Sequence, residues 1–198
     1  MIKTGVLAIQ GAFARHAATL SACGAEVRIV KYRRDLEGLD GLVLPGGEST
    51  TMTKMMGYRI NYEDLFRFAE KNPVFGTCAG LILLGRGADD ARVRQFALVD
   101  AEITRNAYGS QKESFVDDIP LEFDRDNAFH AIFIRAPRIQ SLGNNVRVLA
   151  SCGGFPVLIE SELHLGATFH PELTDDRRIH QYFIQKIKEI KNGKKQST

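Results

Sequence analysis

The first half of the chain alternates short apolar runs with longer segments of helical spacing. Residues 4–9 and 42–44 are continuous apolar runs, which is typical of strands buried on both faces. Residues 26–31 alternate apolar and polar positions and are rich in Val and Ile, so another strand is expected there. Helices are expected at residues 12–23 and 62–71. Strands that alternate with helices predict a parallel sheet with helices on both faces.

The second half, after about residue 95, contains extended segments with few helices between them. Such segments favour hairpins and antiparallel strands, some extending the sheet and some lying over it. They cover residues 96–104, 114–123, 128–135, 146–150, 156–160 and 165–169, and a helix at 177–191 closes the fold. The expected fold class is α/β, with a mostly parallel central sheet, helices on both faces and antiparallel additions in the C-terminal half.

Length and composition fit one domain that spans residues 1–198. The net charge of +2 argues against a nucleic-acid partner, which usually requires a basic stripe. Three cysteines without regular spacing do not form a disulfide framework, so a reducing, cytoplasmic location is expected. The first apolar run is too short for a signal peptide or a membrane span. The sequence has no spacing typical of metal ligands, and no cofactor is expected.

The clearest chemical motif lies at residues 73–84, where an apolar run leads through Gly76, Cys78 and Gly80 into a helical segment. Glycine, any residue, nucleophile, any residue, glycine is the order of a nucleophile elbow, here with Cys in place of Ser. A sharp strand-to-helix turn raises one side chain above the sheet, and the flanking glycines tolerate its crowded backbone. A helix N-terminus also favours the thiolate. The alternative is a buried cysteine in a glycine-rich turn.

A base for this thiol is expected at the end of the strand at 165–169. His170 is placed to take the proton and Glu172 to orient the ring, because side chains two apart on an extended chain share a face. The alternative is a polar surface turn ended by a proline. Glu162 and His164 form a competing pair, which we interpret as surface strand.

A glycine pair supplies candidate backbone donors. Gly46 and Gly47 follow a buried strand, so their N–H groups are candidates for an oxyanion hole. The alternative is a strand-to-helix turn with Ser49 or Thr50 as the helix N-cap, and both interpretations can hold together. The segment lacks the Gly-Lys-Ser/Thr ending of a phosphate loop.

Two arginines, Arg105 and Arg135, each stand at the end of an expected strand. A guanidinium there can hold a substrate carboxylate through charge-assisted hydrogen bonds, with further donors from the adjacent turn. For either arginine alone, a solvated surface position is the simpler interpretation.

Five blocks of sequence together resemble a known family. They are Leu-Pro-Gly-Gly-Glu-Ser-Thr-Thr-Met at 44–52, Phe-Gly-Thr-Cys-Ala-Gly-Leu-Ile at 75–82, Arg-Asn-Ala-Tyr-Gly at 105–109, Phe-Ile-Arg-Ala-Pro at 133–137 and Phe-His-Pro-Glu-Leu-Thr at 169–174. The combination is similar to the class I, triad-type glutamine amidotransferases, whose fold is flavodoxin-like. More narrowly, it resembles the glutaminase subunits of two-component pyridoxal 5′-phosphate synthases, and the resemblance runs through nearly the whole chain.

The resemblance implies a Cys-His-Glu triad in which Cys78 attacks the side-chain amide of L-glutamine, His170 is the acid and base, and Glu172 orients it. It implies an oxyanion hole formed by Gly47 and the backbone of Ala79, with Gln10 near the oxyanion strand and the docking face. It also implies that glutamine is held by Gly47, Glu48, Ser49, Arg105, Ile134 and Arg135. In this family the ammonia passes to a barrel-fold synthase subunit, which combines it with a pentose phosphate and a triose phosphate to make pyridoxal 5′-phosphate.

The match has departures, and other readings stay open. The family often has Arg-Gln where Ser110-Gln111 stands, and a more apolar stretch at residues 89–96; both points touch docking or loop detail. The glutaminase of imidazole glycerol phosphate synthase usually lacks the run at residues 46–49. A thiol peptidase or stress protein of the related sheet fold needs its base near the elbow, whereas the candidate base of this chain, His170, lies about ninety residues after it. A non-catalytic docking module is disfavoured because Cys78 and His170 are both present.

Overall fold

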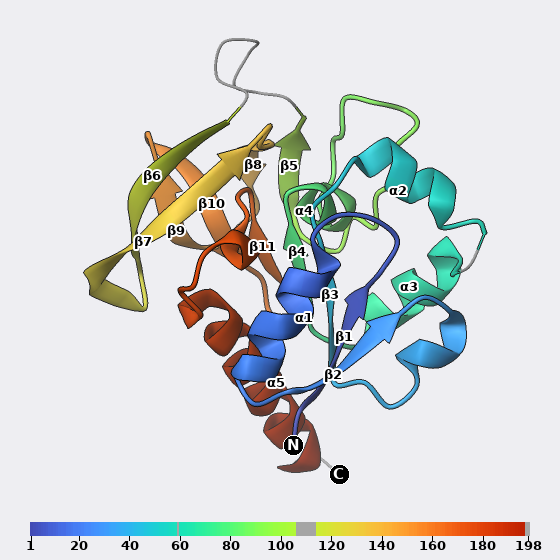
Figure 1. The fold of residues 1–198 in the computed structure, drawn as a ribbon. Coiled ribbons are helices and arrows are strands. Elements are labelled where there is room, and N and C mark those ends of the chain that lie inside the picture. Colours follow the sequence, from blue (N-terminus) through green and yellow to red (C-terminus); the bar gives the residue numbers. More distant parts are fainter. Residues whose placement is uncertain (59, 106–113, 197–198) are drawn as a thin grey trace.

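The computed structural model describes residues 1–58, 60–105 and 114–196. Its centre is a seven-stranded sheet in the order β2-β1-β3-β4-β11-β10-β9 (Figure 1). Neighbours from β2 through to β11 pair in parallel, whereas β10 pairs antiparallel with both β11 and β9. The prediction of a mostly parallel sheet with antiparallel additions is therefore confirmed. The bounds are β1 Lys3–Leu7, β2 Glu26–Val30, β3 Gly41–Leu44, β4 Val74–Thr77, β9 Arg147–Cys152, β10 Phe155–Glu160 and β11 Leu165–Ala167.

Helices cover both faces of this sheet, as predicted (Figure 1). The face that carries Leu42 and Leu44 packs against α2 (Ser49–Met55), α3 (Tyr62–Ala69) and α4 (Ala79–Leu84). The opposite face carries Val43 and packs against α1 (Phe13–Ala22) and α5 (Arg178–Gln196). Side chains alternate between the faces of a strand, so burial on both sides explains the continuous apolar runs. Within the described residues, no helix is both long and apolar enough to cross a membrane.

Two smaller sheets accompany the central one. β5 (Ala101–Thr104) pairs antiparallel with β8 (Arg138–Leu142), and β6 (Ser114–Leu121) pairs antiparallel with β7 (Asp124–Ile134). The β6–β7 hairpin buries its apolar side in the same core as α1 and α5. β5, β6 and β7 fall largely within segments that were expected to be extended, without a prediction of which would lie outside the central sheet, and β8 was not predicted.

The expected strand at residues 96–104 is wrong in its first half, because β5 begins only at Ala101. Before it, the N–H of Phe96 donates to the Leu83 carbonyl at 2.6 Å, and that of Val99 donates to the Leu84 carbonyl at 3.0 Å. This stretch therefore folds back on the end of α4, where Phe96 and Val99 are buried. Apolar residues that cover a helix end look like a strand when only their spacing is known.

Candidate functional site

The sharp turn between β4 and α4 carries the candidate nucleophile. Cys78 is the N-cap of α4, with φ of 48° and ψ of −104°, a backbone conformation uncommon for a side-chain-bearing residue. The flanking glycines are needed for space. A Cβ on Gly76 would lie 2.6 Å from the Gly80 carbonyl group, and one on Gly80 would lie 2.0 Å from the Leu44 carbonyl oxygen. The chain thus makes the strand-to-helix turn that the glycine spacing predicts.

The three thiols differ in their surroundings. Cys78 is 7% exposed, and its Sγ lies 4.0 Å from the Ile134 carbonyl oxygen. Burial raises the pKa of Cys23. Burial and the adjacent Asp117 carboxylate together raise the pKa of Cys152 to about 11. Neither of these two thiols therefore ionises readily at neutral pH.

The strand ladder brings His170 beside Cys78. β11 pairs in parallel with β4, and the N–H of Cys78 itself donates to the Ala167 carbonyl at 2.8 Å. His170 follows three residues later, and its own N–H donates to the Ile132 carbonyl at 2.9 Å. Its Nδ1 lies 2.8 Å from Oε1 of Glu172, so this ring nitrogen donates to the carboxylate. The thiol of Cys78, the imidazole of His170 and the carboxylate of Glu172 are therefore arranged one after another in space.

Burial works to lower the pKa of His170, but the contacts with Cys78 and Glu172 outweigh it and raise the pKa to about 10. For Glu172, burial works in the opposite direction, and the hydrogen bond from His170 outweighs it, so its pKa is lowered. Both directions favour a charged imidazolium held against a carboxylate. A protonated ring beside the thiol is the partner that a thiolate nucleophile requires.

The local geometry of this pair differs from the expectation of an extended chain. His170 is the N-cap of a 3₁₀ turn, η2 (Pro171–Leu173), and the side chain of Glu172 returns to the imidazole through that turn. The competing pair was also misinterpreted as surface strand. Only Glu162 is exposed, whereas His164 is 3% exposed in the turn between β10 and β11. Burial lowers the pKa of His164 to about 4, so this imidazole is neutral at pH 7.

A cavity of about 360 Å³ opens above the thiol at the carboxyl ends of the parallel strands β1, β3, β4 and β11. In open α/β sheets this edge is where ligands bind. Glu172 lies behind His170 and is 2% exposed, and Ala79 does not line the cavity. The cavity brings together the other predicted site residues, with Gly11 and Ile82 in addition: Gln10, Gly47, Glu48, Ser49, Cys78, Arg105, Ile134, Arg135 and His170.

The glycine loop after β3 is shaped by close contacts. A Cβ on Gly46 would lie 2.4 Å from Cε1 of His170, so only glycine leaves room for the imidazole. Gly47 has φ of 153°, and a Cβ there would lie 3.1 Å from Oε1 of Gln10. The Gln10 amide oxygen also accepts from the N–H of Glu48 at 3.1 Å. Gln10 is therefore seated against the loop.

Glu48, rather than Ser49 or Thr50, is the N-cap of α2. Its carboxylate accepts from the N–H of Thr50 at 3.2 Å and from that of Thr51 at 2.7 Å. The hydroxyls of Thr50 and Thr51 donate to it as well, and these hydrogen bonds lower the pKa of Glu48 to about 2. Carboxylates cap helices well, so the N-cap lies one or two positions before the hydroxyl residues that the alternative interpretation proposed.

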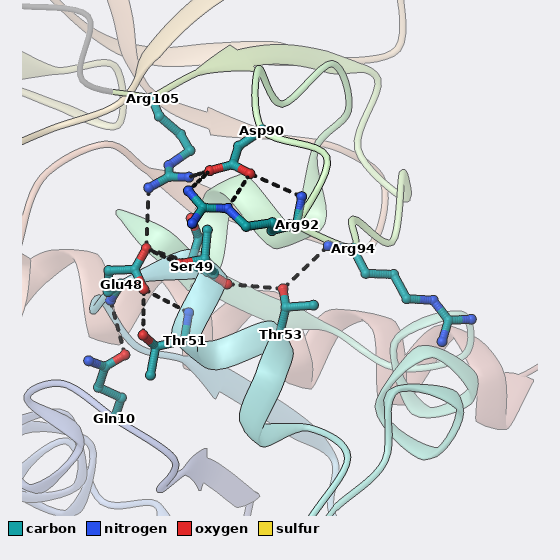
Figure 2. Close-up of polar contacts among 10 residues, drawn as sticks. Gln10, Glu48, Ser49, Thr51, Thr53, Asp90, Arg92, Arg94 and Arg105 are labelled. Carbon is teal, nitrogen blue, oxygen red and sulfur yellow. Dashed lines mark hydrogen bonds and ion pairs between the residues drawn. The ribbon is translucent and has the colours of Figure 1, made fainter.

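Arg105 is fixed between two carboxylates, as Figure 2 shows. Its Nη2 lies 3.2 Å from Oε1 of Glu48, and its Nη1 lies 2.6 Å from Oδ2 of Asp90. Arg92 holds Asp90 from the other side at 2.7 Å. The guanidinium of Arg105 is thus held by two carboxylates at the cavity wall, and its side chain is 17% exposed, whereas Arg135 is exposed.

Sequence reasoning missed Asp90, because its partner is 15 residues away and no local pattern links them. The only signal was the charged character of residues 89–96. The remainder of the motif that begins at Arg105, and the Ser110-Gln111 departure, lie outside the described residues. Among the residues that the structure describes, no cluster of three or more His, Cys, Asp or Glu side chains could hold a metal ion.

Comparisons with known proteins identify the family of this chain. The chain is 47% identical over 192 residues to a pyridoxal 5′-phosphate synthase subunit PdxT of Solibacter usitatus, covering 94% of this chain and 100% of that one. It is 50% identical over 192 residues to the PdxT subunit of Halalkalibacterium halodurans, covering 96% and 97%. A crystal structure of a glutamine amidotransferase superposes with a TM-score of 0.85 at 40% identity, covering 93% of this chain and 98% of that one. Residues 6–189 match the SNO glutamine amidotransferase family, and the chain therefore belongs to that family.

Proposed function

We propose that this chain hydrolyses L-glutamine to L-glutamate and ammonia. The observation that carries the proposal is that Cys78 and His170 line one cavity together with Glu48 and Arg105, while Glu172 holds His170 from behind. The ionised Glu48 carboxylate suits the α-ammonium group of glutamine, and the Arg105 guanidinium suits its α-carboxylate. The side-chain amide then reaches down to the thiol.

The reaction follows from the positions of these groups. The Cys78 thiolate attacks the amide carbon, and the N–H groups of Gly47 and Ala79 stabilise the oxyanion that forms. His170 gives its proton to the leaving nitrogen, the C–N bond breaks, and ammonia and a thioester remain. His170 then takes a proton from the water that attacks the thioester; the C–S bond breaks, and glutamate, the Cys78 thiolate and protonated His170 result. Glu172 keeps the imidazole oriented through both steps.

The ammonia serves pyridoxal 5′-phosphate synthesis, and so vitamin B6 biosynthesis. Two similar proteins are named as subunits of pyridoxal 5′-phosphate synthase, which supports this assignment. The partner in our proposal is a barrel-fold synthase subunit that combines the ammonia with a pentose phosphate and a triose phosphate. We further propose that residues 1–198 form one glutaminase domain and that the complex works in the cytoplasm.

The test is ammonia release from glutamine, measured with and without the synthase subunit. Cys78→Ser is expected to abolish release while the protein stays folded, because a hydroxyl is a far weaker nucleophile at neutral pH. A glutamine-like electrophile should label Cys78 alone. Labelling of Cys152 instead, or wild-type release by Cys78→Ser, would overturn the assignment.

A further inference from the structure

Two buried histidines lie behind the triad and are not used by the chemistry above. His16 on α1 and His180 on α5 are both 0% exposed. Nδ1 of His16 lies 3.0 Å from Nε2 of His180. The ring of Phe75 packs edge-on against both, with centroid separations of 6.3 Å and 5.9 Å. Two polar rings in an apolar setting need a reason, because buried polar groups cost free energy unless they are paired.

The pair continues the line of the triad. Nε2 of His16 lies 3.2 Å from Oε2 of Glu172, which is the carboxylate oxygen that His170 does not bind. The same nitrogen lies 3.3 Å from the hydroxyl of Thr77, the residue before the nucleophile. Within the described residues, Oε2 of Glu172 has no hydrogen bond, and Nε2 of His16, at 3.2 Å, is the polar atom placed beside it.

The contacts assign the hydrogens of both rings. Burial lowers the pKa of His16 to about 4 although Glu172 opposes this, and burial lowers that of His180 to about 3, so each ring carries one hydrogen at neutral pH. A lone pair on Nε2 of His16 would face a carboxylate and be repelled, so the hydrogen resides there. Nδ1 of His16 then accepts from Nε2 of His180.

This arrangement leaves Nδ1 of His180 as an unprotonated nitrogen. It is the atom of the pair that has no hydrogen-bond partner in the described part of the chain. The opposite arrangement would place an unpaired N–H at the same buried position, and buried N–H groups without partners are rarer than under-satisfied acceptors. This one assignment of ring hydrogens therefore fits the contact of His180 with His16, that of His16 with Glu172 and that of Glu172 with His170.

We propose that His16 is a positioning residue of the triad: its Nε2–H restrains Oε2 of Glu172, and His180 fixes the tautomer that makes this possible. The terminal torsion of a glutamate is broad, so one hydrogen bond at Oε1 leaves the carboxylate free to turn. A second restraint at Oε2 keeps Oε1 aligned with His170. This inference rests on the proposed glutaminase function, whose nucleophile and base it serves.

The experiment compares two substitutions of His16. The amide of His16→Gln reaches the position of Nε2 and can still donate to Glu172, whereas the amide of His16→Asn reaches only the position of Nδ1. With glutamine as substrate, His16→Asn is expected to lower kcat about tenfold or more with KM nearly unchanged, because the binding groups are untouched. His16→Gln is expected to retain most of the turnover. His164→Gln is the matched control for loss of a buried imidazole away from the triad.

A second measurement does not depend on glutamine. The rate at which iodoacetamide alkylates Cys78 is followed against pH in each variant. Poor alignment of Glu172 weakens the imidazolium of His170, so the midpoint of thiolate formation should rise by about half a unit or more in His16→Asn. A wild-type chain that alkylates normally but releases no ammonia even with the synthase subunit present would refute the glutaminase and leave this test of His16 intact.

Equal kcat values and equal alkylation profiles for folded His16→Asn and His16→Gln would overturn the proposal. Thermal melts establish which variants fold. Should His16→Asn not fold, His180→Phe decides, because it removes the donor that fixes the His16 tautomer without touching Glu172. A raised alkylation midpoint in His180→Phe supports the proposal, and an unchanged profile refutes it.

Discussion

Cys78 combines a reactive side chain with an unfavourable backbone. Its φ of 48° places it where residues with a Cβ are uncommon, and such conformations typically cost about 1–3 kcal/mol. The cost is tolerated because the turn holds the sulfur in the cavity rather than in the core. Backbone strain at this residue is thus tied to its place in the reaction.

That strain predicts an inverted order of stability for two inactive variants. In the interior of a helix or strand, glycine is destabilising relative to alanine, but at a helix N-cap with this φ it relieves the steric conflict. Cys78→Gly is expected to be more stable than Cys78→Ala by about 1 kcal/mol. The comparison requires urea unfolding of both variants, which lose nearly the same side chain. A more stable Cys78→Ala would mean that the turn is not strained.

Arg105 is the residue whose loss should affect glutamine binding most directly. Arg105→Met is expected to raise KM about tenfold, equivalent to about 1.4 kcal/mol, with a smaller effect on kcat. Steady-state kinetics provide the measurement. Arg92→Met is the control, because Arg92 holds Asp90 from outside the cavity and its side chain is 77% exposed. Equal KM values for the two variants would return Arg105 to a merely structural role.

At the scale of elements, the turn between β10 and β11 contains a pH-sensitive contribution to stability. His164 is buried there, and its folded-state pKa of about 4 lies below its ordinary value of 6.5. The unfolded chain therefore binds a proton between pH 6.5 and 4 that the folded chain does not, so acidification through this window destabilises the fold.

The free energy of unfolding should accordingly fall between pH 7 and pH 5. His164→Leu is expected to reduce that fall by about 1–2 kcal/mol, since this variant has no imidazole to protonate in the unfolded state. Urea titrations at the two pH values measure it. His16 and His180 contribute in the same direction, so part of the fall remains. Parallel behaviour of wild type and His164→Leu would contradict the assignment.

How far the elements could be predicted depends on the range of the forces that fix them. The central strands were predictable because burial on both faces gives continuous apolar runs, as in β3. β8 was missed because Arg138–Leu142 mixes apolar and polar residues and is ordered by pairing with β5. The first half of the 96–104 segment was misread because its apolar residues cover the end of α4. The pattern of apolar residues in a sequence shows which residues are buried. It does not show which segment they pack against, because that depends on the tertiary structure.

The residues of the candidate site also differ in how far the sequence could predict them. Cys78, His170 and the glycine loop stand in short motifs whose spacing the turn geometry itself requires. Asp90, His16 and His180 act through partners far along the chain, and none of them stands in a motif. His16 on α1 meets Glu172 of η2 only because both elements pack on one face of the sheet. Side chains that support a site from behind are set by such packing.

At the scale of the whole molecule, Gln10 connects the segment after β1 with the loop after β3. The amide oxygen of Gln10 accepts a hydrogen bond from the N–H of Glu48, and the Gln10 side chain lies against Gly47, a candidate donor of the oxyanion hole. Glycines at 46 and 47 carry no side chain to fix their peptide planes. A partner that contacts Gln10 can therefore stabilise one orientation of this loop over another by differential binding.

The synthase subunit is accordingly expected to raise glutamine turnover at least tenfold, equivalent to about 1.4 kcal/mol. Gln10→Ala should weaken this activation more than it weakens the basal rate. Ammonia release is measured over a titration with the partner, with Gln185→Ala on the exposed side of α5 as the control. Full activity of the isolated chain, unaltered by the partner, would show that the oxyanion hole is already formed.

The ladder between β4 and β11 has a consequence for how the molecule loses its activity. The N–H of Cys78 makes one of the hydrogen bonds between these strands, because it donates to the carbonyl of Ala167. His170 follows Ala167, the last residue of β11, by three positions. That amide hydrogen can exchange with solvent only when the two central strands part, and the thiol and imidazole separate in the same event. Fraying of β2, which lies at the edge of the central sheet, need not disturb them. Residual activity in partly denatured protein would thus come from molecules in which β4 and β11 are still paired.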